Sequence, residues 1–215
     1  MPILRAVLPQ PWLDLALIVS AYLIGSLPVG VIVARLTGAP DPRTVGSGRT
    51  GGTNAWRAMG LPLGIAVGVL DLAKGALPVL LATLLGSSPA IRALAGIAVV
   101  LGAWASIFLR FHGGRGVAAG IGAMAIVQPL VIVLGAPVFF GVIGWTRYVS
   151  VGSLVGSAAG GALLIPFVFV GLNPWTDLLF AAVGVAVVWL AHRDNIGRLL
   201  RGEERRIEFA RRQSD

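Results

Sequence analysis

The sequence predicts an all-α protein that crosses a membrane several times. Hydrophobic residues make up 56% of the 215 positions and charged residues only 12%, and the mean hydropathy is +0.87. One soluble core of this length could not hide so many apolar side chains. Six long apolar runs follow one another, and the stretches between them are too short to form a soluble domain. The runs cover residues 13–36, 61–86, 91–109, 117–144, 149–171 and 178–191.

The first run is predicted to be a retained membrane helix. It is longer than the apolar region of a signal peptide, and it leads to Arg35 rather than to a small-residue cleavage site. The second and third runs each have the length of one membrane crossing. Starting with the amino terminus outside, these three crossings bring the chain to the cytoplasmic side.

The distribution of arginine supports this orientation. Arginines flank the loop between the first two runs and the loop around residues 110–116, and seven more follow residue 191. The connections near Ser87 and Asn173 carry few. Because cytoplasmic loops are enriched in Lys and Arg, the arginine-rich segments and the carboxyl terminus should be cytoplasmic.

The run 117–144 decides the number of crossings. A single crossing would leave the arginine-rich tail outside, whereas two short helices would bring it inside. Gln128-Pro129 lies near the middle of the run, where a proline can break a helix. We therefore predict about seven membrane segments, some of them short, within one domain at 1–200, followed by a basic cytoplasmic tail at 201–215. The alternative is one long tilted helix with the tail outside.

Polar clusters fall on the predicted cytoplasmic side, and they share a chemistry suited to phosphate. The longest is "GSGRTGGTNAWR" at 46–57, and "FHGGRGVAAG" at 111–120 and "HRDNIGRLLRGEE" at 192–204 follow. Glycines let backbone N–H groups approach a ligand, while hydroxyls, amides and guanidinium groups supply further donors. Thr53-Asn54 is expected to precede a helix, whose free N–H groups would face the same anion.

A fourth cluster, "DLAKG" at 71–75, places Asp71 and Lys74 three positions apart in or near a membrane segment. Burial of both is tolerable only if they pair or serve a site. Any single cluster can equally be a plain turn with topology-setting charges. Four clusters on one face favour a site.

The chemistry that the sequence lacks also narrows the function. There is no cysteine, no carboxylate cluster at metal-ligand spacing, no His followed four residues later by Asp, and no Walker-type Gly-Lys-Ser/Thr run. We therefore expect neither metal nor cofactor. A mostly cationic site offers few bases, so its substrate should arrive already activated.

Taken in order, these motifs and "YVSVGS" at 148–153 resemble the bacterial acyl-phosphate:glycerol-3-phosphate acyltransferase family. The resemblance extends from the first helix to Glu204. It implies a seven-helix inner-membrane enzyme that transfers a fatty acyl group from acyl phosphate to the 1-position of glycerol 3-phosphate. The products would be lysophosphatidic acid and phosphate, as the first committed step of phospholipid synthesis.

The resemblance also implies site residues. Arg57, Arg115, His192 and Asn195 are the candidate catalytic residues. Ser47, Arg57 and Arg115 would hold phosphate oxygens, and Ser150, His192 and Asn195 would position glycerol 3-phosphate. The candidate substrate-binding residues are Ser47, Thr53, Asn54, Arg57, Lys74, Gly113, Gly114, Arg115, Gly116, Ser150, Ser153, His192 and Asn195.

Two assignments are open for the proton of the attacking hydroxyl. The mixed anhydride is reactive, so alignment of hydroxyl and carbonyl can supply much of the acceleration, and the leaving phosphate can accept the proton. His192 is the competing base, because histidine titrates near neutral pH.

This chain departs from the family pattern at five positions. The family commonly has Asn at Arg49, Lys at His112 and Arg115, Thr at Ala119, and Glu at Asp194. Arg115 matters most, because a guanidinium binds phosphate as a fork rather than as a point charge. Arg49 adds a cation near the pocket.

Other functional classes fit less well. A transporter or channel for a phosphorylated metabolite would use the same cationic clusters, with Gln128-Pro129 as a broken helix, but the two halves show no convincing duplication. A non-catalytic lipid-binding protein would explain the basic tail but not the polar loops. The net charge of +8 lies mostly in membrane-flanking loops, so nucleic acid is not an expected partner. The expected partners are the two substrates and the lipid bilayer, with a monomer as the working hypothesis.

The resemblance generates a first prediction about Arg115. Arg115→Ala should abolish acyl transfer, whereas Arg115→Lys should retain much of it because the positive charge remains. The measurement is the rate of lysophosphatidic acid formation by each variant. Equal activity of Arg115→Ala and wild type would remove Arg115 from the site.

Overall fold

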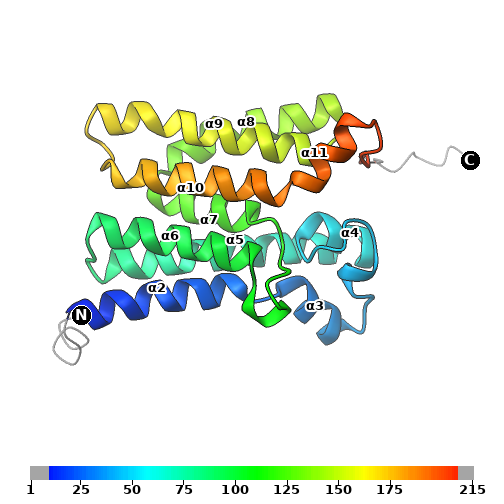
Figure 1. Cartoon of the computed structure of the whole chain (residues 1–215), viewed down its shortest axis with the longest axis horizontal. Coiled ribbons are helices and arrows are strands. Elements are labelled where there is room, and N and C mark those ends of the chain that lie inside the picture. Colours follow the sequence, from blue (N-terminus) through cyan, green and yellow to red (C-terminus); the bar gives the residue numbers. More distant parts are fainter. Residues whose placement is uncertain (1–9, 208–215) are drawn as a thin grey trace, which may run out of the picture.

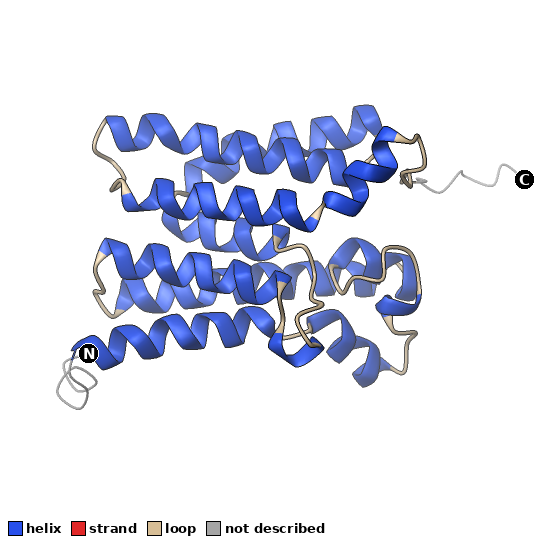
Figure 2. Cartoon of the chain, viewed as in Figure 1, coloured by secondary structure: helices blue, strands red, loops and turns tan. Residues whose placement is uncertain are grey.

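The computed structural model describes residues 10–207, which form a bundle of antiparallel and parallel helices joined by short loops (Figure 1, Figure 2). No strand occurs in this part of the chain. The helices, with two short 3-10 turns, are α2 (Gln10–Ser26), α3 (Val29–Thr37), η1 (Pro42–Thr44), α4 (Gly52–Met59), α5 (Leu61–Leu84), α6 (Pro89–Trp104), η2 (Ile107–Leu109), α7 (Val117–Val127), α8 (Pro129–Thr146), α9 (Val149–Phe169), α10 (Thr176–Ala191) and α11 (Arg193–Leu200).

Length and composition identify the membrane segments. Four helical stretches within 10–207 are long and apolar enough to cross a membrane alone: α5, Pro89–Leu109, α8 and α9. The pairs α2–α3 and α10–α11 pass the same test together, with bends of 49° and 55°, and α7 is a shorter apolar helix. The predicted all-α, polytopic membrane fold is confirmed, while the count of seven segments stays a prediction.

The predicted break at Gln128-Pro129 is confirmed. Helix α7 ends at Val127 and α8 begins at Pro129, whose missing N–H costs nothing in the first helical turn. The Gln128 side chain accepts a hydrogen bond from the Leu130 N–H at 3.4 Å, which caps the new helix. The run 117–144 is therefore two helices rather than one long tilted helix.

The expectation of one helix over residues 13–36 is wrong in detail. This run is broken between Ser26 and Val29, where Pro28 stands. Proline lacks a backbone N–H and its ring clashes with the preceding turn, so the helix ends and restarts at an angle. The short α3 then turns toward the loop that leads to α4 (Figure 1).

Glycine allows the helices to pack closely. A Cβ atom on Gly75 of α5 would lie 2.6 Å from the Cα of Ala119 on α7, and one on Gly25 of α2 would lie 2.9 Å from the Cα of Val99 on α6. Small residues bring membrane helices together because van der Waals contact is the main attraction between them. This packing brings α4, α11 and the α6–α7 and α8–α9 connections to one end.

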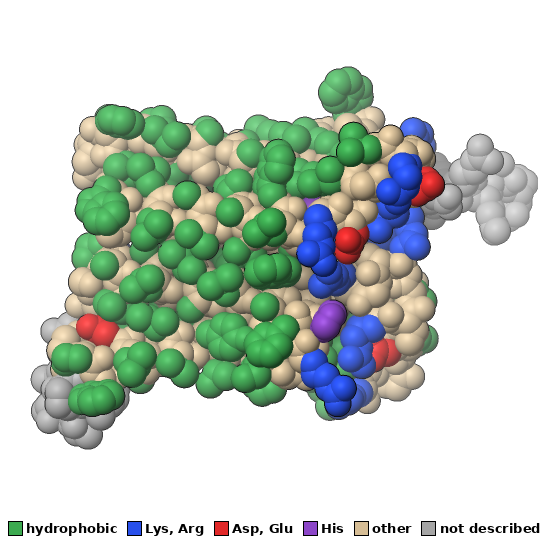
Figure 3. All heavy atoms as spheres, viewed as in Figure 1, with side chains coloured by type: hydrophobic (Ala, Val, Ile, Leu, Met, Phe, Trp, Pro, Cys, Tyr) green, Lys and Arg blue, Asp and Glu red, His purple; other side chains and the backbone are tan. Residues whose placement is uncertain are grey.

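That end is polar and the rest of the surface is apolar. Figure 3 shows Lys and Arg side chains gathered around α3, α4 and α11, with hydrophobic side chains over the remaining surface in view. Many large hydrophobic side chains are exposed along the helices, as expected for a surface that faces lipid. We call the charged region the polar end.

Lys74, predicted to bind substrate, instead holds the break between α2 and α3. Its Nζ lies 2.8 Å from Asp71 Oδ1 and donates a hydrogen bond to the Leu27 carbonyl at 2.8 Å. The backbone N–H four residues after Leu27, that of Val31, donates to the Pro28 carbonyl instead. The Leu27 carbonyl also accepts a hydrogen bond from the Val29 N–H at 3.0 Å, so Lys74 is a second donor to this carbonyl at the break.

The pair predicts a stability effect that distinguishes pairing from substrate binding. Lys74→Met should destabilise the protein by about 3–5 kcal/mol, because it leaves the Asp71 carboxylate buried without its cation. The double variant Asp71→Leu, Lys74→Met should recover most of this loss, since no buried charge remains. Thermal melting in detergent measures both. If the double variant melts no higher than the single one, the pair is not the reason for the loss.

Candidate active site

Six of the predicted site residues meet in one small polar cavity at the polar end, of about 20 Å³. They come from segments far apart in the sequence: α4 and the loop before it, the loop before α7, the start of α9, and α11. The six are Ser47, Thr53, Arg57, Arg115, Ser150 and Asn195, and the other lining residues are Val149, Arg198, Glu204 and Arg205. We call this cavity the polar pocket.

Helix α4 presents two of these side chains together. It begins at Gly52, so Thr53 lies in its first turn rather than before it, and Arg57 follows one turn later on the same face. Gly51 caps the helix without a side-chain hydrogen bond. Because glycine has no side chain at this position, helix α4 can begin directly beside the pocket.

Asn54 is a loop anchor and does not line the polar pocket. It is 3% exposed, and its Nδ2 donates to the carbonyls of Pro42, Val45 and Arg49 at 2.5, 3.1 and 2.8 Å. Its Oδ1 accepts a hydrogen bond from the Ser47 N–H at 3.1 Å. One amide thus ties the loop 42–49 to α4 and places Ser47 at the pocket.

The predicted glycines of the α6–α7 loop position Arg115. The N–H groups of Gly113 and Gly114 donate to the carbonyls of Trp104 and Ala103 at 2.9 and 2.8 Å. A Cβ atom on Gly113 would lie 2.7 Å from the Trp104 oxygen, so only glycine fits there. Gly116 has a φ of 75° where α7 begins, a conformation that favours glycine. These contacts aim Arg115 into the pocket.

The pocket is electrostatically prepared for an anion. Burial lowers the pKa of Arg115 to about 10, while Glu204 opposes that shift and other nearby arginines reinforce it. Burial, together with Arg205 and Arg198, also lowers the pKa of Arg57. Arg115 Nε is buried and finds no hydrogen-bond partner among the described residues. Buried, charged donors of this kind bind phosphate or carboxylate oxygens.

Glu204 is a residue of the polar pocket that sequence reasoning missed. Its side chain is 7% exposed, and its Oε1 accepts hydrogen bonds from Ser150 at 3.0 Å and Asn195 at 2.5 Å. Its Oε2 accepts one from Arg198 at 2.8 Å. The sequence analysis predicts only a basic tail over residues 201–215. The adjacent acids Glu203 and Glu204 in this arginine-rich segment were the available signal.

Backbone contacts hold the segment that carries Glu204. The Glu203 N–H donates to the Arg198 carbonyl and the Ile207 N–H to the Arg147 carbonyl, both at 2.8 Å. Arg206 Nε donates to the Tyr148 hydroxyl at 3.1 Å, with its guanidinium 5.3 Å from that ring's centre. Residues 203–207, which we call the C-terminal strap, therefore lie across the α8–α9 connection and close the pocket.

His192 and Ser153 do not line the polar pocket. His192 joins α10 to α11 and is 1% exposed, and its Nδ1 lies 2.7 Å from the Val188 carbonyl. A carbonyl only accepts, so Nδ1 carries the proton. Ser153 lies one turn after Ser150 on α9 and donates to the Val149 carbonyl at 2.9 Å. Its side chain lines a second cavity.

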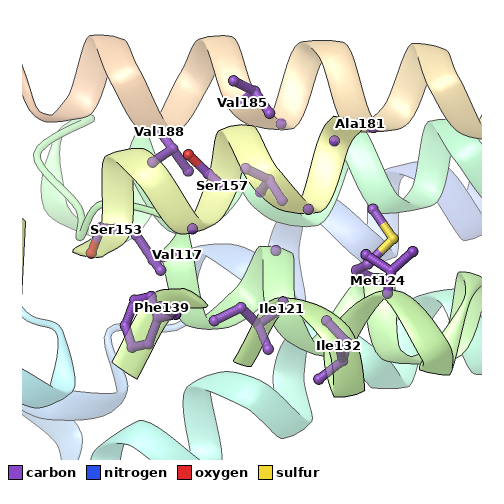
Figure 4. Close-up of a pocket in the computed structure, with 18 of the residues that line it drawn as sticks. Val117, Ile121, Met124, Ile132, Phe139, Ser153, Ser157, Ala181, Val185 and Val188 are labelled. Atoms are coloured by element: carbon purple, nitrogen blue, oxygen red, sulfur yellow. The ribbon is translucent and has the colours of Figure 1, made fainter. Parts of the chain in front are cut away.

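This second cavity is apolar and measures about 320 Å³ (Figure 4). Helices α7, α8, α9 and α10 form most of its walls, and valine, isoleucine, phenylalanine and glycine predominate. The hydroxyls of Ser153 and Ser157 donate to carbonyls of their own helix. We call it the apolar cavity. Ser150 and Ser153 place it one helical turn from the polar pocket.

The structure shows the contacts of several residues that depart from the family pattern. Arg49 Nη1 donates to the Gly113 carbonyl at 3.3 Å, and its Nη2 lies 3.9 Å from Asp194. Arg49 therefore links the two loops and α11 without lining the polar pocket. Ala119 is 2% exposed and packs against Gly75. His112 is exposed, with its Nδ1 2.7 Å from the Arg110 carbonyl.

Comparison with known proteins identifies the family. Residues 15–202 match the family model described as glycerol-3-phosphate acyltransferase. The chain belongs to this family. A relative from Dehalococcoides mccartyi, "Glycerol-3-phosphate acyltransferase 3", is 37% identical over 205 residues, covering 90% of this chain and 95% of the relative. One from Aquifex aeolicus is 40% identical over 194 residues, covering 90% and 98%.

Two solved structures of a family member have the same fold. Both are of PlsY, an integral membrane glycerol 3-phosphate acyltransferase. The glycerol 3-phosphate form matches with a TM-score of 0.84 at 38% identity, covering 91% of this chain and 96% of that one. The lysophosphatidic acid form gives 0.81 at 36%, covering 91% and 95%. The predicted family and acyltransferase activity are confirmed, and the transporter alternative is not favoured.

Thr53 and Asn54 are neighbours on α4, but substitution of Asn54 should affect stability and substitution of Thr53 should affect phosphate binding. Asn54→Asp keeps the side-chain size but turns a carboxylate toward three carbonyl oxygens, so it should lower the stability by about 3 kcal/mol or more. Thr53→Val should change the stability by about 0.5 kcal/mol or less and weaken phosphate binding. Thermal melting and calorimetric titration with inorganic phosphate separate the two effects. If Asn54→Asp melts at the same temperature as the wild type, Asn54 is not the loop anchor.

Proposed function

We propose that this protein transfers a fatty acyl group from acyl phosphate to the 1-position of glycerol 3-phosphate. The observation that carries the proposal is that a cationic polar pocket and an apolar cavity lie one helical turn apart on α9, at Ser150 and Ser153. An acyl phosphate has the same two parts, a phosphate head and an alkyl chain. The carbonyl carbon that joins them would lie between the two cavities.

The arrangement supports specific roles at this junction. Arg57 and Arg115 bring positive charge to the pocket lining, and Ser47 adds a hydroxyl, so these residues would hold phosphate oxygens. Ser150 and Asn195 line the same pocket, hydrogen-bonded to Glu204, and would position the glycerol hydroxyls. Gly113, Gly114 and Gly116 would contribute by positioning Arg115. Asn54 would contribute by positioning Ser47, and Lys74 by stabilising the α2–α3 break.

The reaction needs no protein nucleophile. The 1-hydroxyl oxygen of glycerol 3-phosphate attacks the acyl carbonyl carbon, a new C–O ester bond forms, and the C–O bond to the phosphate breaks. Arg57 and Arg115 stabilise the negative charge that develops on the carbonyl and on the departing phosphate. Both substrates are held against each other, which removes much of the entropic barrier.

We assign the hydroxyl proton to the leaving phosphate. His192 lies outside the pocket lining, is almost fully buried, and directs its Nδ1 proton at the Val188 carbonyl. The phosphate oxygens are next to the reacting hydroxyl throughout and gain negative charge as the bond breaks. In this scheme His192 is a positioning residue that fixes the junction of α10 with α11, which carries Asn195.

Substrate entry requires the C-terminal strap to move. A cavity of about 20 Å³ has room for roughly one water molecule, because the Glu204 carboxylate stands among the arginines. Glycerol 3-phosphate is larger, so its phosphate would take over part of the hydrogen bonding that Glu204 provides. The strap is held by a few hydrogen bonds near the surface, which can open at modest cost.

The same proposal includes the setting of the enzyme. The polar end would face the cytoplasm, because the arginine-rich segments gather there and the positive-inside rule applies. The amino terminus would lie outside, in the bacterial inner membrane. Residues 1–200 would act as one monomeric membrane domain, followed by the basic segment 201–215.

The test is a direct assay of both products. Detergent-purified protein is incubated with palmitoyl phosphate and labelled glycerol 3-phosphate, without metal or acyl-CoA, and released phosphate and labelled lysophosphatidic acid are measured. We expect equal amounts of the two products. Arg57→Ala should abolish both, and Arg35→Ala, which removes an arginine outside the polar pocket, should leave both unchanged.

Different results would contradict different parts of the proposal. Phosphate release without the labelled lipid would indicate hydrolysis or another acceptor. Lipid formed only when acyl-CoA replaces palmitoyl phosphate would exclude acyl phosphate as the donor. Absence of both products from folded protein would overturn the proposed reaction.

A further inference from the structure

The depth of the apolar cavity follows from its helical walls. Nearest the polar pocket its lining includes Ser153 of α9 and Val188 of α10, and we call this end the mouth. The deepest lining residues on these helices are Gly161 and Phe180, each eight positions from the mouth. At about 1.5 Å per residue this is about 12 Å. An extended carbon chain advances a little over 1 Å per atom, so the cavity holds about ten carbons.

The far end of the cavity is a packed wall. Met124, Val131 and Phe180 are the deepest lining residues of α7, α8 and α10, and they belong to the buried core at 8%, 1% and 2% exposure. The ring of Phe180 packs on Gly96 of α6 so closely that a Cβ atom there would lie 2.8 Å from it. We call these three residues the floor.

Polar contacts behind the floor fix its position. Gln128, between Met124 and Val131 in the chain, donates from Nε2 to Asn173 Oδ1 at 2.7 Å. Asn173 Nδ2 donates to Asp177 Oδ2 at 2.9 Å and to the Val127 carbonyl at 3.2 Å. These bonds join the α7–α8 break to the start of α10, one turn before Phe180. The floor therefore cannot recede without breaking buried hydrogen bonds.

Missing side chains make the cavity wide enough for an alkyl chain. Glycines line it on all four helices, and Gly184 lies halfway between Val188 at the mouth and Phe180 at the floor. A Cβ atom on Gly184 would meet no atom within 4 Å. A larger side chain there would project into the cavity without displacing backbone.

We infer that the apolar cavity measures the acyl chain, and that its floor at Met124, Val131 and Phe180 sets the length beyond which added carbons bring no further gain. This inference rests on the proposed acyl transfer. Burial of each methylene favours binding, so kcat/KM rises with chain length while carbons enter the cavity. It stops rising when the chain reaches the floor, at about ten carbons.

The test compares chain-length profiles of kcat/KM for saturated acyl phosphates. In the wild type, each added carbon should raise kcat/KM by up to about fourfold. We call the chain length at which kcat/KM ceases to rise the stop. Gly184→Leu should move the stop to about five carbons, because it blocks the cavity halfway along its depth. Gly141→Leu is the matched control: Gly141 lies on the exposed side of α8, outside the cavity, and a Cβ atom there also meets nothing within 4 Å.

A variant of opposite effect keeps the test independent of folding. Met124→Ala should move the stop to longer chains, because it lowers the floor. Partitioning of the acyl phosphates into detergent or bilayer is the same for every variant, so only the shift of the stop between variants counts. A stop that stays in place in active Gly184→Leu, or in Met124→Ala, overturns the inference and leaves the proposed reaction intact. Absence of transfer by the wild type at every chain length overturns both.

Discussion

The structure depends on holding cations of the same sign close together. Arg57, Arg115, Arg198 and Arg205 line one cavity of about 20 Å³, and their mutual repulsion opposes every contact that brings their segments together. Glu204 is the one acidic residue in that lining, and it also hydrogen-bonds Ser150 and Asn195. The tightly bonded loops around Asn54 and the α6–α7 glycines supply the remaining stabilisation. A pocket that remains cationic despite this repulsion is suited to a negatively charged ligand.

The polar pocket and the apolar cavity are shaped by different kinds of contact. At the polar end, position is set by hydrogen bonds to loop carbonyls, and each side chain there has few alternatives. In the apolar cavity, glycines on α7, α8, α9 and α10 leave the space open, and the packed floor limits it. An amphipathic substrate requires both, and α9 connects them, because Ser150 and Ser153 lie one turn apart on the same helix.

Much of this could be read from the sequence, and the exceptions have physical causes. Apolar runs predicted the helices, and Pro129 predicted the α7–α8 break, because these signals are local. The α2–α3 break at Pro28 was missed, since a proline in a long apolar run is tolerated when another residue satisfies the backbone, as Lys74 does here. The types of Asn54 and Lys74 suit phosphate, and their contacts with backbone carbonyls could not be predicted because the carbonyls lie in other segments of the chain. Glu204 was missed because its partners are distant in the sequence.

The short α7 has a consequence for how the protein enters the membrane. Its eleven residues span about 16 Å, roughly half the thickness of the hydrocarbon layer. It cannot be inserted as an independent span, so α7 and α8 must enter as a hairpin with the polar Gln128 at its tip. The amide that pairs with Gln128 belongs to Asn173, which is synthesised only after α9. Within the hairpin, Gln128 Oε1 already accepts the Leu130 N–H, whereas its Nε2 donor finds its partner only after α9 has been made, so this contact can fix the depth of the hairpin only late in synthesis.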